Sequence, residues 1–142
     1  GPALLLLGAG WGFVLERLGY TPEPQQVAEA LLREQGWVQV CAMVFVALLA
    51  PVLEEFVFRG WLLPVVGRGL SWHRHGRNVA LVLTSLGFAS MHADAPWALP
   101  PLFVIGFVCG WLRFRSGSTW PGVLAHAGNN GIALAVVVVG AS

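Results

Sequence analysis

Long hydrophobic runs separated by short polar stretches make up most of this chain. A helix of about 20 apolar residues crosses the ~30 Å hydrocarbon core of a bilayer. The pattern predicts an all-α, polytopic transmembrane helical bundle of about five spans, in which the first run is short for a full crossing. The runs cover residues 3–18, 36–66, 79–92, 97–112 and 118–140.

Composition supports a membrane protein. Of the 142 residues, 56% are hydrophobic and only 11% are charged, whereas a soluble domain carries about 25% charged residues. Membrane lipid is therefore an expected partner, and nucleic acid is not, because no basic run is interleaved with aromatic residues. We expect a single domain. Residues 1–35 form an N-terminal span followed by a surface amphipathic helix or a solvated connector over 25–35, and residues 36–142 form the core.

Arginine positions predict the orientation. Five of the eight arginines lie in the stretches 67–77 and 113–117. Loops rich in arginine and lysine face the cytoplasm. We therefore expect both stretches in the cytoplasm, the C-terminus on the opposite side, and a bacterial inner membrane as the location.

The second hydrophobic run contains ionisable groups, which are costly in hydrocarbon and usually mark function. Glu55 and Arg59 are four residues apart, so on a helix they share a face and can pair. Glu54 lies about 100° round the helix from its neighbour and is left free for chemistry. Pro51 lacks an N–H group and frees backbone carbonyls just before this pair.

Two later runs contain polar residues at a similar depth. Phe88 and His92 share a helix face, as do His126 and Asn130. Counted from the arginine stretches, Glu54, His92, Asn130 and His126 lie about 20, 21, 18 and 12 Å into the membrane. A single buried histidine or asparagine usually has a structural role, but this gathering at one level favours an active site.

Two kinds of chemistry fit these side chains. A carboxylate beside a histidine can deprotonate water, and a second histidine with an asparagine can stabilise an oxyanion, which together describe amide hydrolysis. Alternatively, Glu54, His92 and His126 are possible zinc ligands that would leave a fourth position for water.

The order and spacing of the polar residues resemble the three motifs of the CAAX protease and bacteriocin-processing (CPBP, or ABI) intramembrane proteases. This family includes the Ras-converting CAAX prenyl endopeptidases. The resemblance covers roughly residues 40–138. It rests on Glu54-Glu55-x-x-x-Arg59, Phe88-x-x-x-His92 and His126-x-x-x-Asn130.

The resemblance implies a helical bundle with a water-filled cavity that opens into the membrane. It implies an intramembrane endopeptidase in which Glu54 and His92 activate water and His126 and Asn130 form the oxyanion site, without a metal cofactor. Glu55, Arg59 and Phe88 are then structural residues around the site. The substrate is a peptide or protein reached from the membrane, and it need not be prenylated. A hypothesis from another class is a non-catalytic immunity or partner-binding membrane protein. Family members usually have further N-terminal spans, so we expect this chain to be a core or a fragment.

Overall fold

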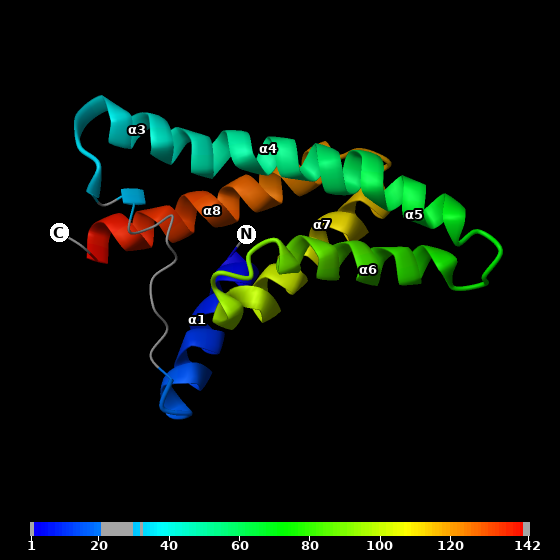
Figure 1. Cartoon of the computed structure of the whole chain (residues 1–142), viewed down its shortest axis with the longest axis horizontal. Coiled ribbons are helices and arrows are strands. Elements are labelled where there is room, and N and C mark those ends of the chain that lie inside the picture. The colour runs from blue at the N-terminus through cyan, green and yellow to red at the C-terminus, as the bar shows by residue number, and fades with distance from the viewer. Residues whose placement is uncertain (1, 21–29, 32, 141–142) are drawn as a thin grey trace.

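The computed structural model describes residues 2–20, 30–31 and 33–140, and within these residues the ordered elements are all helical (Figure 1). The all-α prediction is therefore confirmed. The surface helix expected over 25–35 lies largely outside the described residues. The elements are α1 (Pro2–Arg17), α3 (Gly36–Val44), η1 (Phe45–Leu49), α4 (Ala50–Glu55), η2 (Phe56–Leu62), α5 (Leu63–Gly69), α6 (Gly76–Ser90), η3 (Pro96–Ala98), α7 (Leu99–Ser116) and α8 (Trp120–Gly140).

The elements α3 to α5 form one continuous helix, Gly36–Gly69, of 34 residues. Two π-helical segments, η1 and η2, interrupt its α-helical hydrogen bonding. Each ends two residues before a proline, Pro51 or Pro64. A proline supplies no N–H group, so the hydrogen bonds of the preceding turn must shift. The helix therefore continues through both prolines while leaving carbonyl groups free.

Three helices in the described part of the chain are long and apolar enough to cross a membrane: Gly36–Gly69, Pro96–Ser116 and Trp120–Val139. The other two predicted spans are also helices, but α1 has 16 residues and α6 has 15. At 1.5 Å per residue they extend about 24 and 22 Å, less than the hydrocarbon thickness.

Two predicted boundaries near α6 were wrong. The loop expected over 67–78 is shorter, because α5 continues to Gly69 and α6 already begins at Gly76. His92 was expected inside the span, but it lies in a turn beyond Ser90. The N–H groups of Met91 and His92 bind carbonyls three residues back, so the α-helix tightens and ends there.

Small residues allow α6 and α7 to pack closely as antiparallel neighbours. A methyl group on Gly106 would lie 3.3 Å from Phe88 Cδ1 and from Ser85 Cα. Close approach through glycine is typical of helices packed in membranes. A buried cluster of Phe58, Phe88, Ile105 and Cys109 joins the long helix to this pair.

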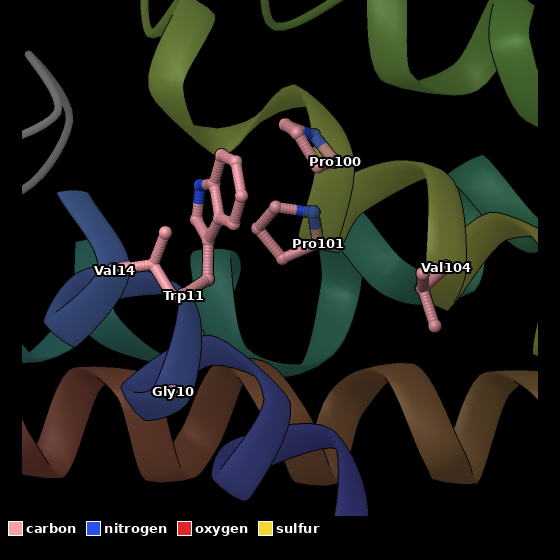
Figure 2. A pocket seen from close by; sticks show the side chains of 6 residues that line it. All are labelled: Gly10, Trp11, Val14, Pro100, Pro101 and Val104. Atoms are coloured by element: carbon pink, nitrogen blue, oxygen red, sulfur yellow. The ribbon is translucent and has the colours of Figure 1, made fainter. Parts of the chain in front are cut away.

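Helix α1 rests against the start of α7. Trp11 Nε1 donates a hydrogen bond of 2.6 Å to the carbonyl oxygen of Trp97. Figure 2 shows the apolar pocket beside this contact, which is lined by Gly10, Trp11, Val14, Pro100, Pro101 and Val104.

Candidate active site

A buried ion pair lies at the centre of the bundle. Arg59 Nη1 donates to Glu55 Oε1 at 2.9 Å, and the two side chains are 2% and 0% exposed. The pairing predicted from their spacing is therefore present. Arg59 Nη2 donates to the carbonyl oxygen of Gly106 at 2.8 Å, which fastens the long helix to α7. The desolvation cost of a buried ion pair is offset only when further hydrogen bonds of this kind are made.

Two glycines and an aromatic ring make room for this pair. A methyl group on Gly106 would lie 3.0 Å from Arg59 Nη2, and one on Gly122 would lie 3.0 Å from Glu55 Oε2. The Phe88 ring covers the guanidinium, with Arg59 Cζ 4.6 Å from the ring centroid. The sequence analysis did not identify either glycine. For Gly106, the available signal in the sequence was its spacing from Gly110, four residues further along the same helix, which is typical of a closely packed helix face.

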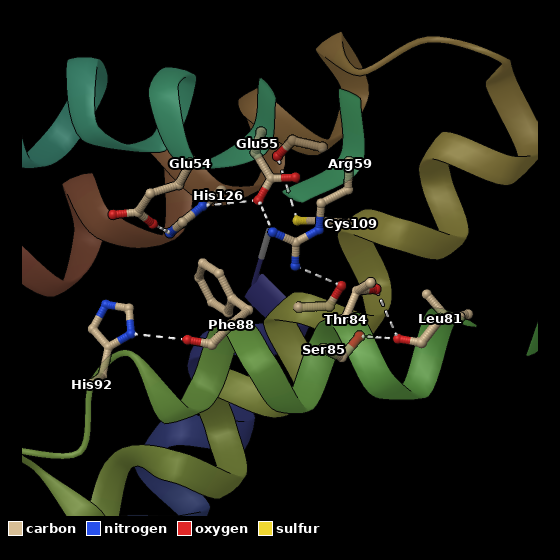
Figure 3. A network of polar contacts seen from close by, with 12 residues as sticks. Glu54, Glu55, Arg59, Leu81, Thr84, Ser85, Phe88, His92, Cys109 and His126 are labelled. Atoms are coloured by element: carbon tan, nitrogen blue, oxygen red, sulfur yellow. Dashed lines mark hydrogen bonds and ion pairs between the residues drawn. The ribbon is translucent and has the colours of Figure 1, made fainter. Parts of the chain in front are cut away.

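His126 connects the two neighbouring glutamates. Its Nδ1 lies 3.1 Å from Glu55 Oε1, and its Nε2 lies 3.8 Å from Glu54 Oε2 (Figure 3). An ionised carboxylate can only accept hydrogen bonds, so with Glu55 ionised the Nδ1 atom carries the proton of this contact. The other nitrogen then faces Glu54. His126 is buried, whereas the Glu54 side chain is 33% exposed.

Asn130 is held by the long helix. Its Nδ2 donates to the carbonyl oxygen of Val46 at 3.1 Å. The N–H of Ala50, the usual α-helical partner of this carbonyl, binds Phe45 instead. The π-helical partner would be Pro51, which has no N–H group. The carbonyl freed by the proline is therefore the acceptor that positions Asn130.

His92 approaches the site through Phe88. Its Nδ1 lies 3.3 Å from the Phe88 carbonyl oxygen. The Phe88 ring contacts both imidazoles, with centroid distances of 5.4 Å to His92 and 5.4 Å to His126 (Figure 3). Within the described residues no hydrogen bond or ion pair joins His92 to Glu54. The structure thus places Glu54 against His126, whereas His92 meets the site at its edge, through Phe88.

The zinc alternative requires three converging ligands. Over residues 2–20, 30–31 and 33–140, no group of three or more His, Cys, Asp or Glu side chains is placed to hold a metal ion. Glu54, His92 and His126 therefore do not form a zinc site as they are arranged.

Comparison with known proteins adds two findings. Residues 36–132 match the family model described as type II CAAX prenyl endopeptidase Rce1-like. The UPF0177 protein YxdF of Lactococcus lactis subsp. lactis (strain IL1403) is 21% identical over 91 residues, which are 64% of this chain and 47% of that protein. The chain thus spans about half the length of the curated relative that it matches. No solved structure matches this chain significantly.

Proposed function

Because this chain belongs to the Rce1-like family of type II CAAX prenyl endopeptidases, we propose that it hydrolyses peptide bonds within or beside the membrane. It is an integral membrane protein, with three helices long and apolar enough to cross a bilayer. The proposed substrate is a peptide segment that enters from the membrane.

The observation that carries the proposal is the contrast between two adjacent carboxylates. Glu55 is buried and bound by Arg59 and His126, whereas Glu54 is partly exposed and has no arginine partner in the described part of the chain. Paired carboxylates in different environments can take different roles. Glu55 holds the site together, and Glu54 is available to accept a proton.

In the proposed reaction, Glu54 removes a proton from water as the water oxygen attacks the scissile carbonyl carbon. The same proton then passes to the amide nitrogen, the C–N bond breaks, and a carboxylic acid and an amine leave. His92, at the edge of the site, orients the water. No step requires an oxidant, a reductant or another reactant.

His126 and Asn130 are the proposed donors to the oxyanion. The Asn130 amide has two N–H groups, and the bond to Val46 uses one of them. For His126 to donate through Nε2 while Nδ1 donates to Glu55, the ring must be an imidazolium. Glu54 and Glu55 lie on either side of the ring, one at each nitrogen.

Replacement of the proposed base tests this function. We expect Glu54→Gln to abolish cleavage of a fluorogenic peptide in proteoliposomes while leaving the thermal melt unchanged, because Glu54 makes no buried ion pair with arginine. Glu16→Gln, which removes an exposed carboxylate near the end of α1, is the matched control and should cleave normally. Loss of folded protein with Glu54→Gln would make Glu54 structural. Absence of cleavage by the wild type over a broad peptide library would favour the non-catalytic partner-binding alternative.

We further propose that the arginine-rich ends face the cytoplasm of a bacterial cell, as the positive-inside rule indicates. Cysteines placed singly in the 70–75 loop and labelled from one side of the membrane would test this orientation.

A further inference from the structure

A groove of about 450 Å³ lies between α6 and α7, at the end of the bundle where α6 begins and α7 ends. Its wall is apolar and is formed by Leu81, Val82, Phe107 and Trp111. Two exposed guanidinium groups, Arg77 and Arg115, also line it. The groove is separate from the polar cluster around Glu54.

Contacts with aromatic rings hold both arginines. Arg77 Nη2 donates to the Phe114 carbonyl oxygen at 3.2 Å, and its Cζ lies 4.1 Å from the Phe114 ring centroid. Arg115 Cζ lies 5.5 Å from the Trp111 ring centroid. A guanidinium has five N–H donors, and the Phe114 bond of Arg77 uses one of them. The arginines are thus positioned in advance and retain donors for a ligand.

No acidic side chain of these loops balances this charge. The stretches 67–78 and 113–118 contain five of the eight arginines and none of the seven acidic residues. The ligand that complements the groove must therefore carry negative charge at one end and an apolar portion at the other.

We propose that this groove binds an anionic phospholipid, with the phosphate held between Arg77 and Arg115 and an acyl chain along the apolar wall. The volume lies within the range of about 300–1,000 Å³ typical of small-molecule sites. Basic pockets between membrane helices bind anionic lipid head groups. A soluble anion would leave Phe107 and Trp111 uncovered, and a zwitterionic lipid would not neutralise the arginines. This proposal does not depend on the peptidase activity.

Native mass spectrometry of the purified full chain in detergent tests the proposal. The probes are dioleoyl phosphatidylglycerol and dioleoyl phosphatidylcholine, which share acyl chains and differ in charge. We expect phosphatidylglycerol to be retained in preference, and Arg77→Gln with Arg115→Gln to reduce its retention about tenfold. The matched control, Arg68→Gln with Arg74→Gln, removes two arginines from the same end but outside the groove lining, and should change retention by less than about twofold.

A second variant leaves the charge unchanged. Val82→Trp introduces a large ring into the groove and should also reduce phosphatidylglycerol retention. This variant tests the proposal independently if the arginine double variant fails to fold. Equal retention of the two lipids, or an equal loss in the Arg68 and Arg74 control, would overturn the proposal. So would displacement of the lipid by an equal concentration of inorganic phosphate, because that result would show an anion site without a lipid chain.

Discussion

Two glutamates that are neighbours in sequence have very different surroundings. Glu55 points into the contact between three helices, where Arg59 and His126 bind the same carboxylate oxygen. The other oxygen, Oε2, is buried and has no hydrogen-bond partner among the described residues. Burial of this oxygen without a hydrogen bond costs desolvation free energy, so the stability of the site depends on the two contacts made through Oε1. Glu55 is therefore needed both for its charge, which pairs with Arg59, and for its position, which holds His126.

We expect Arg59→Ala and Glu55→Ala each to lower the free energy of unfolding by about 3–5 kcal/mol, because each leaves an unpaired buried charge. The Glu55 variant should be the worse of the two, since it also removes the partner of His126. The double variant should lose less stability than the sum of the single variants. Thermal melts in detergent of all four proteins measure this, and simple addition of the two losses would contradict the pairing.

Asn130 and its neighbour Asn129 provide a matched comparison. Asn130→Ala should slow peptide cleavage about 100–1,000-fold, the usual effect of losing one oxyanion donor. Asn129 has the same side chain one position away, so Asn129→Ala should have little effect on rate. Steady-state kinetics with the fluorogenic peptide distinguish the two. Equal rates for Asn130→Ala and the wild type would remove Asn130 from the oxyanion site.

At the level of elements, the sequence predicted more about position than about hydrogen bonding. The apolar runs located the helices, and Pro51 indicated that carbonyl groups would be freed. The π-helical segments could not be predicted from the sequence. They depend on which backbone N–H groups donate to the carbonyls of the preceding turn, since the proline has no N–H group to donate. The end of α6 was also misplaced. Met91 and Ala93 continue the apolar pattern on either side of His92, and the tightening of the last turn leaves no clear trace in it.

Close packing between elements can be tested on α8, where two of its four glycines, Gly122 and Gly128, lie in contrasting surroundings. We expect Gly122→Ala to destabilise the fold by about 1–3 kcal/mol, because the new methyl group meets Glu55 Oε2 at 3.0 Å. Gly128 has nothing within 4 Å of its would-be methyl group. Gly128→Ala should therefore be neutral or stabilise by up to about 1 kcal/mol through helix propensity. Thermal melts that ranked these variants in the opposite order would contradict the packing.

For the whole molecule, the depth estimate from the sequence brought residues of three helices to one level, and the structure places Glu54, His126 and Asn130 on facing helices. The sequence did not predict that His126 would contact both glutamates, or that Arg59 would bind the Gly106 carbonyl. Both contacts depend on how far helices approach and rotate against one another. Spacing within one helix contains little information about either.

The proposed reaction uses no metal ion, and this is tested on the whole molecule. We expect the purified protein to contain less than one metal ion per chain and to keep its peptidase activity after dialysis against a strong chelator, because the proposed reaction uses only side chains. Elemental analysis and the peptide assay measure this. One zinc per chain, with activity lost on chelation and restored by zinc, would require the ligands to rearrange and would replace Glu54 as the proposed base.

The unequal helix lengths have a consequence for the surrounding bilayer. The 34-residue helix extends about 51 Å, which is longer than the ~30 Å hydrocarbon core, whereas α6 extends only about 22 Å and is shorter than it. Lipid beside a short helix must thin, or water must fill the deficit. His92 lies just beyond the end of α6, so the shortfall falls next to the proposed site. With the arginine-rich end of α6 at one membrane surface, as proposed, the aqueous boundary would lie closer to the proposed site, and a substrate peptide bond would cross less hydrocarbon to reach it.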